Sequence, residues 1–178
     1  KRLGSLGVSS FKERHIEPQS IVALLARIGT SDPVEPIADV ETLIETFDFD
    51  RFGRAPARFD NDELRQLNQK IVHLLDYDTV QDRLPAAMDA KAWEVIRPNL
   101  HDMSEVGDWW QVVTGPVEIP EMDGDDRVFV ALARTSLEKL EWSATVWKDW
   151  TGALKESTGR KGKPLFMPLR QALTGLDH

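Results

Sequence analysis

The 178-residue sequence contains no cysteine and no long apolar run. Without cysteine, the chain can form neither a disulfide framework nor a thiolate metal site. A membrane helix needs at least about 18 consecutive apolar residues, so no transmembrane segment is expected. The chain also lacks a basic start followed by an apolar core, so no signal peptide is expected. These absences fit a cytosolic protein best.

Signals for catalysis are missing as well. The four histidines are isolated from one another, and no group of His, Asp and Glu has the spacing of metal ligands. No serine lies in a nucleophile-elbow pattern, and no two carboxylates of the acidic stretch 32–63 are placed as a catalytic pair. The acidic segment 118–126 lacks the ligand order and closing Glu of a calcium loop, so an exposed linker is expected there. We therefore predict no catalytic residue and no metal site in this chain.

The charge is negative overall but unevenly distributed. The net charge is −8 and the isoelectric point is about 5.0, which argues against non-specific binding to nucleic acid. Yet the window 155–170 is strongly basic and holds only one acid, Glu156; its positive residues are Lys155, Arg160, Lys161, Lys163 and Arg170. A short basic loop is usually solvated surface, but this contrast points to a polyanionic partner. A phosphate-binding P-loop is excluded, because the glycine spacing is wrong and no Ser or Thr follows the lysine.

Helical periodicity runs through nearly every segment, whereas strand signals are poor. We therefore expect an all-α chain of two packed helical modules, with a boundary near residue 80. In the first half of the chain we expect a helix that begins near Val8 with Ser9 or Ser10 as its cap, followed by helices over 18–28, 40–47 and 60–75, the last capped by Asp60. Next we expect a helix over 89–103, which is capped by Asp89 and broken near Pro98, and helices over 104–113 and 127–140. The last two expected helices are one capped by Ser143 and ended by Gly159, and a short one that begins at Pro168 and ends at Gly175.

Six tryptophans lie in or beside these helices. Large aromatic residues at helical spacing pack in a core far more often than they stack on bases. We therefore expect most of them to be core residues, with stacking on unpaired bases as the alternative for one exposed tryptophan.

Four segments resemble bacterial glutamyl-tRNA synthetases. The run 159–175 is similar to their segment near the C-terminus, a basic or glycine-containing turn followed by Met/Gln-Pro-Leu-Arg-x-Ala-Leu-Thr-Gly. The run 24–30 is similar to a Leu-Leu-Ala-Arg-x-Gly-Thr helix end. The run 55–68 resembles the Phe-Asp-x-x-Lys-Leu-x-x-Leu-Asn signature of the stem-contact domain, although Glu63 stands where the family usually has Lys. Residues 1–4 resemble the tail of the Lys-Met-Ser-Lys-Arg loop.

The resemblance implies that the chain is the C-terminal portion of such an enzyme. Residues 1–80 would then hold the end of the ATP signature loop and a helical stem-contact domain, and 81–178 an α-helical anticodon-binding domain truncated at its C-terminus. The parent enzyme would use ATP and magnesium to attach glutamate to tRNA(Glu). This fragment would bind tRNA without a cofactor of its own, as a monomer and away from membranes, and would be inactive alone because it lacks the catalytic fold.

The same resemblance assigns the candidate site residues. Lys1 and Arg2 would steady the ATP phosphates, and Arg97 would read the anticodon base that separates glutamate from glutamine codons; its alternative role is a surface arginine covering apolar area with its stem. The remaining candidates are basic residues near the end of the chain, with phosphate contacts assigned to Arg160, Lys161 and Lys163 and an anticodon base edge to Arg170.

Two alternatives remain open. A helical protein-interaction module without RNA binding would suit the acidic net charge, and it predicts no salt-dependent binding to RNA. A synthetase of broader specificity that also charges tRNA(Gln) would share the same residues.

Overall fold

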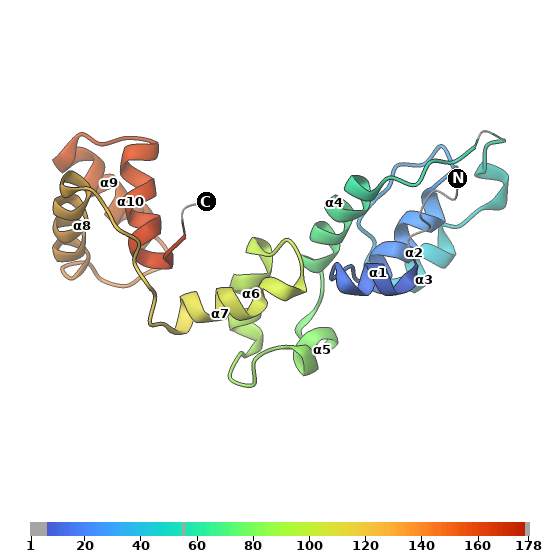
Figure 1. Cartoon of the computed structure of the whole chain (residues 1–178), viewed down its shortest axis with the longest axis horizontal. Coiled ribbons are helices and arrows are strands. Elements are labelled where there is room, and N and C mark those ends of the chain that lie inside the picture. The colour runs from blue at the N-terminus through green and yellow to red at the C-terminus, as the bar shows by residue number, and fades with distance from the viewer. Residues whose placement is uncertain (1–6, 55, 177–178) are drawn as a thin grey trace. The chain divides into compact units, whose positions relative to one another are not determined.

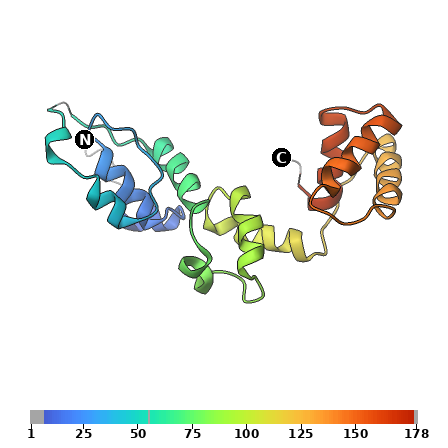
Figure 2. The same ribbon diagram turned by 180° about the vertical axis from the view of Figure 1, so that it is seen from behind.

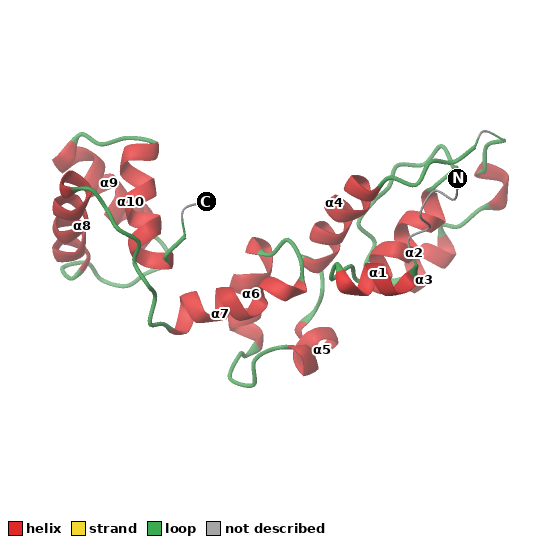
Figure 3. Ribbon diagram, viewed as in Figure 1, coloured by secondary structure: helices red, strands yellow, loops and turns green. Residues whose placement is uncertain are grey.

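The computed structural model describes residues 7–54 and 56–176, so Lys1 and Arg2 lie outside the described residues. Within these ranges the chain forms helices and loops (Figure 3). One isolated β-bridge joins Thr30 and Phe52. The all-α expectation is confirmed. None of the described helices is long and apolar enough to cross a membrane.

Ten α-helices occur in the described residues (Figure 1). Their bounds are α1 (Val8–Glu13), α2 (Pro18–Arg27), α3 (Val40–Glu45), α4 (Asn61–Val72), α5 (Tyr77–Val80), α6 (Ala90–Ile96), α7 (Val106–Thr114), α8 (Gly124–Leu137), α9 (Val146–Thr158) and α10 (Lys163–Thr174). Short 3-10 turns occur at Phe49–Arg51, Gln81–Arg83, Arg97–Asn99 and Met103–Glu105.

The chain divides into two compact units, Lys1–Trp110 and Gln111–His178. The core of the first unit includes residues from both sides of position 80, among them Leu75 and Trp93. The functional division between residues 1–80 and 81–178 stays a prediction.

Helices α2 and α4 form the centre of the first unit. Leu64, Leu67 and Ile71 are buried on one face of α4, as their helical spacing predicts. Beside them the Asn68 side chain is also buried, and its Oδ1 accepts hydrogen bonds from the Glu17 backbone N–H at 2.8 Å and the Ser20 hydroxyl at 2.9 Å. This amide satisfies two buried donors and ties α4 to the start of α2.

The second unit contains α8, α9 and α10, which lie together in both views of the ribbon (Figures 1 and 2). Its buried core is small and consists of Phe129, Ala133, Trp150, Leu154, Leu165 and Leu169. The indole N–H of Trp150 donates to the Ala133 carbonyl at 3.0 Å and to the Ser136 hydroxyl at 2.9 Å, so its polar edge is satisfied inside this core.

The tryptophans do not share one environment. Trp93 and Trp150 are buried, which confirms the core expectation for them. Trp142 is 81% exposed and Trp147 is 48% exposed, so for these two residues the expectation was wrong. Exposed indole surface of this kind is available to a ligand.

Helix starts depend on local hydrogen bonds, and only some were predicted correctly. Asp60 accepts from the Asp62 backbone N–H at 2.8 Å and Asp89 accepts from that of Ala92 at 2.8 Å, which confirms both as caps. The serine caps were wrong. Helix α1 begins after Gly7, and the Ser10 hydroxyl donates to the Gly7 carbonyl. Helix α9 begins after Thr145, whose backbone N–H donates to the Ser143 hydroxyl oxygen. Serine here makes a local turn bond in place of a cap.

We expect the carboxyl group of Asp39 to titrate with a pKa of about 2, against an ordinary value of 3.8. The Thr42 hydroxyl is the main cause, and the backbone N–H groups of Glu41 and Thr42 also donate to the ionised form. Because the folded pKa is lowered, the stabilisation of α3 is fully present above pH 3.8 and is lost as the pH falls through about 2. Thr42→Val should move the pKa back toward 3.8, measured by an NMR titration of the Asp39 side chain. An unchanged pKa in this variant would contradict the role of the hydroxyl.

Candidate functional site

The basic segment predicted from the sequence forms the connection between α9 and α10. Helix α9 ends at Gly159, which has a left-handed φ of 71°, and α10 is closed by Gly175 with a φ of 72°. Both glycine ends are confirmed. A Cβ at Gly175 would lie 2.6 Å from the Glu118 carbonyl oxygen, so both the conformation and the space require glycine there.

The predicted start of the last helix at Pro168 was wrong. Helix α10 begins at Lys163, and Pro164 lies in its first turn, where a missing N–H is harmless. Pro168 therefore lies inside the helix and cannot donate to the carbonyl four residues earlier, that of Pro164. The Arg160 Nη1 donates to that carbonyl at 3.1 Å and supplies the hydrogen bond that Pro168 cannot make.

Arg160 is also bound to α8. Its guanidinium forms an ion pair with Asp126, donates to the Asp125 carbonyl at 3.2 Å, and lies 4.4 Å above the ring of Phe129. The side chain is only 22% exposed. The geometry makes Arg160 a link between α8 and the start of α10, and its predicted contact with an RNA phosphate stays a prediction.

Lys161, Lys163 and Arg170 are exposed, and no ion pair is recorded for them among the described residues. Lys163, Phe166 and Arg170 follow one another at helical spacing and form one exposed stripe along α10. The structure thus presents two cations and an aromatic ring on the same face of one short helix, held in place by Arg160.

Arg97 lies in the other compact unit. Its guanidinium donates to the Leu75 carbonyl at 2.9 Å and pairs with Glu94 at 2.6 Å, and its side chain is 19% exposed. These contacts fit the alternative role of an arginine that covers the surface of its own helix bundle. Its anticodon role stays a prediction.

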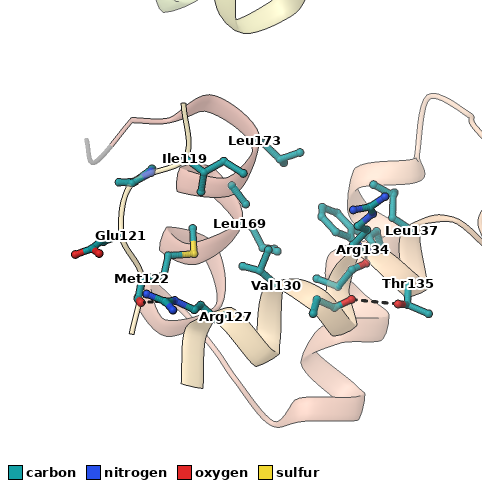
Figure 4. Close-up of a pocket in the computed structure, with 15 residues that line it drawn as sticks. Ile119, Glu121, Met122, Arg127, Val130, Arg134, Thr135, Leu137, Leu169 and Leu173 are labelled. Carbon is teal, nitrogen blue, oxygen red and sulfur yellow. Dashed lines mark hydrogen bonds between the residues drawn. The ribbon is translucent and has the colours of Figure 1, made fainter. Parts of the chain in front are cut away.

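A mainly apolar cavity of about 880 Å³ lies within the second unit. Figure 4 shows Met122, Val130 and Leu169 around it, from the 119–122 segment, α8 and α10. No group of three or more His, Cys, Asp or Glu that could hold a metal ion occurs in the described ranges. Neither this cavity nor the basic segment brings together an acid, a base and a nucleophile, and the exposed cations of α10 are suited to bind an anion.

Comparison with known proteins identifies close relatives of the whole chain. It is 55% identical over 178 residues to "Glutamate--tRNA ligase 2" of Erythrobacter litoralis and 56% identical over 178 residues to "Glutamate--tRNA ligase 1" of Novosphingobium aromaticivorans. These matches cover 100% of this chain but only 39% and 40% of the two relatives. The chain therefore spans about two fifths of their length. No family model matches.

A solved structure shares the fold. The crystal structure of a glutamate-tRNA synthetase from Elizabethkingia anophelis matches with a TM-score of 0.59 and 19% sequence identity. The match covers 93% of this chain and 36% of that protein. It supports the all-α architecture independently of the close sequence relatives.

Proposed function

Since the whole chain is related in sequence to glutamate–tRNA ligases, we propose that it is the tRNA-binding portion of such an enzyme. The observation that carries the proposal is the exposed stripe of Lys163, Phe166 and Arg170 on α10, within the segment that resembles the family most specifically. Lys161 and Lys163 neutralise backbone phosphates, and Arg170 hydrogen-bonds the edge of an anticodon base.

The rest of the parent enzyme supplies the chemistry in this proposal. The partner is tRNA(Glu), and ATP with magnesium activates glutamate in a part of the protein beyond this chain, with Lys1 and Arg2 contributing at the ATP phosphates. The chain has no cofactor of its own, is monomeric and acts in the cytoplasm. Residues 1–80 contact the tRNA stem and 81–178 contact the anticodon.

The experiment that tests the proposal is a titration of the 178-residue chain with three transcripts, at two salt concentrations. The transcripts are a glutamate tRNA, the same tRNA with an altered anticodon, and a glutamine tRNA. Preference for the first over the second supports anticodon reading. Equal affinity for the glutamate and glutamine tRNAs would support the synthetase of broader specificity. Absence of salt-dependent binding to any of them would contradict the proposal in favour of a protein-interaction module.

Arg170→Ala is expected to weaken binding to the cognate tRNA about 10-fold and to remove most of the preference over the anticodon-altered tRNA, because a base contact contributes about 1–3 kcal/mol. Lys163→Ala, about two helical turns away on the same stripe, is the matched control. It should weaken both tRNAs by the same factor and lower the salt dependence. If Arg170→Ala also weakens both tRNAs equally, its role is a phosphate contact and base reading must be assigned elsewhere.

A further inference from the structure

A second basic feature lies beside α10 and adds Lys148 of α9 to Lys155 and Lys161 of the basic window. A cleft of about 270 Å³ runs between α9 and the start of α10. Lys148, Thr151 and Lys155 line one wall from a single face of α9, and Lys161, Gly162 and Phe166 line the other. Its volume is slightly below the range of about 300–1,000 Å³ for drug-sized ligand sites, which suits a smaller group such as one phosphate with its sugar.

No ion pair with an acidic side chain is formed by the lysines of this cleft among the described residues. All ion pairs recorded in the described ranges are formed by arginine or histidine, so none neutralises Lys148, Lys155 or Lys161. Three uncompensated ammonium groups around one cleft repel each other and favour a bound anion. This cluster is positive in a chain whose net charge is −8.

An aromatic surface adjoins the lysines. Phe166 lines the cleft, is 45% exposed, and has its ring centroid 6.5 Å from that of Trp147 at an interplanar angle of 33°. Trp147 is itself 48% exposed and is held from behind by an edge contact with buried Trp150. Two rings in a fixed arrangement beside cations match the combination that binds single-stranded nucleic acid.

We propose that the cleft lined by Lys148, Lys155 and Lys161 binds a backbone phosphate of an unpaired RNA segment, and that the adjacent base stacks on Phe166 and Trp147. The site rests on the proposed tRNA-binding function and extends it to residues of α9. Phe166 also lies one helical turn before Arg170 on α10. An unpaired strand that reaches Arg170 can therefore continue over Phe166 into the lysine cleft, so the anticodon loop is the segment of tRNA that fits.

The first test measures the phosphate contact. In the 178-residue chain, Lys148→Ala and Lys155→Ala are each compared with Lys139→Ala, an exposed lysine of the same unit that does not line the cleft. All three variants lose the same charge. For binding to the glutamate tRNA transcript, each cleft variant is expected to reduce the slope of log affinity against log salt concentration by about 0.7, the value for one single-stranded phosphate. Lys139→Ala should leave the slope unchanged.

The second test blocks the cleft without removing a lysine. Gly152 lines the cleft on α9, and a Cβ added there meets nothing within 4 Å. Gly152→Glu places a carboxylate among the lysines and is expected to weaken binding about 10-fold or more. Gly152→Ala is its control and should bind as the unaltered chain does, since alanine fits the space and favours the helix. Thermal melting of both variants verifies that the unit is folded.

The third test addresses the aromatic surface. Trp147→Leu is expected to reduce the affinity about 10-fold, in the range for loss of one stacked base. Trp142→Leu removes an indole that is 81% exposed and has no recorded ring contact in the described residues, and it should have no effect. Phe166→Leu repeats the test from α10 in case the Trp147 variant unfolds.

The outcomes separate this site from the function on which it rests. If Arg170→Ala and Lys163→Ala weaken binding while the cleft variants bind with unchanged affinity and slope, the cleft is not an RNA site and the proposed function stands. If the unaltered chain binds no tRNA even at low salt, the proposed function fails and the cleft proposal fails with it.

Discussion

Trp93→Ala is expected to lower the free energy of unfolding of the first unit by about 3–5 kcal/mol, the usual range for deleting a fully buried large aromatic side chain. Trp93 is 0% exposed in the core of that unit. Its indole N–H donates to the Leu75 carbonyl at 2.8 Å, and the same oxygen accepts from Arg97 at 2.9 Å. The substitution therefore creates a cavity and also removes one of the two hydrogen bonds to the Leu75 carbonyl, which lies in the turn after α4.

The measurement must report on each unit separately, because a chain of two units need not unfold in one step. Hydrogen exchange followed by mass spectrometry gives the opening free energy of peptides from each unit. Trp142→Ala is the matched control, since Trp142 is 81% exposed and its loss should change stability by no more than about 0.5 kcal/mol. Equal effects of the two variants would mean that Trp93 is not central to the core of the first unit.

Arg160→Ala is expected to lower the free energy of unfolding of the second unit by about 2–3 kcal/mol. The substitution leaves Asp126 without its cation, removes the donor to the Pro164 carbonyl, and uncovers the ring of Phe129. Breaking a fully buried ion pair costs more, but both partners here retain some contact with water, so the lower range applies. Thermal melting and hydrogen exchange of α8 and α10 peptides measure the loss.

Arg160→Lys distinguishes charge from geometry. Lysine keeps the positive charge but has no planar fork, so it cannot reach Asp126, the Pro164 carbonyl and the Asp125 carbonyl together. We expect it to restore only a minor part of the stability. Full recovery by lysine would show that the charge alone matters. A double-mutant cycle of Arg160 with Asp126→Asn gives the coupling energy of the Arg160–Asp126 ion pair. It thereby separates the contribution of this pair from that of the hydrogen bond between Arg160 and the Pro164 carbonyl of α10.

The helical class and several helix ends were predictable because they depend on neighbouring residues. Asp60 and Asp89 are caps as expected, and Gly159 and Gly175 end their helices as expected. It was harder to predict which residues of each helix face the core. In α8, Leu132 is 45% exposed, whereas Phe129 and Ala133 are buried. Several apolar residues lie on more than one face of that helix, so periodicity alone could not choose between them.

The candidate site was likewise only partly predictable from the sequence. Its basic residues from Lys155 onward and the resemblance around Arg170 were visible in the sequence, whereas Lys148 of α9 was not assigned to the site because it lies before the basic window. Trp147 was assigned to the core by its spacing, and only its packing shows that almost half of its surface is exposed. Two lysines seven residues apart on a helix are a signal that could have been noted, but without the facing helix they indicate only a solvated surface.

By itself, the sequence determined that this chain is helical, where its glycine-ended helices stop, and that it resembles glutamyl-tRNA synthetases, because these depend on composition, periodicity and local motifs. Only the tertiary structure decided that Arg160 is bound to Asp126, 34 residues earlier, while Lys148, Lys155 and Lys161 surround an open cleft. The physical reason is that a charge acts on whatever lies within a few ångströms of it. Those neighbours are brought together by the packing of α8, α9 and α10, and not by their order in the chain.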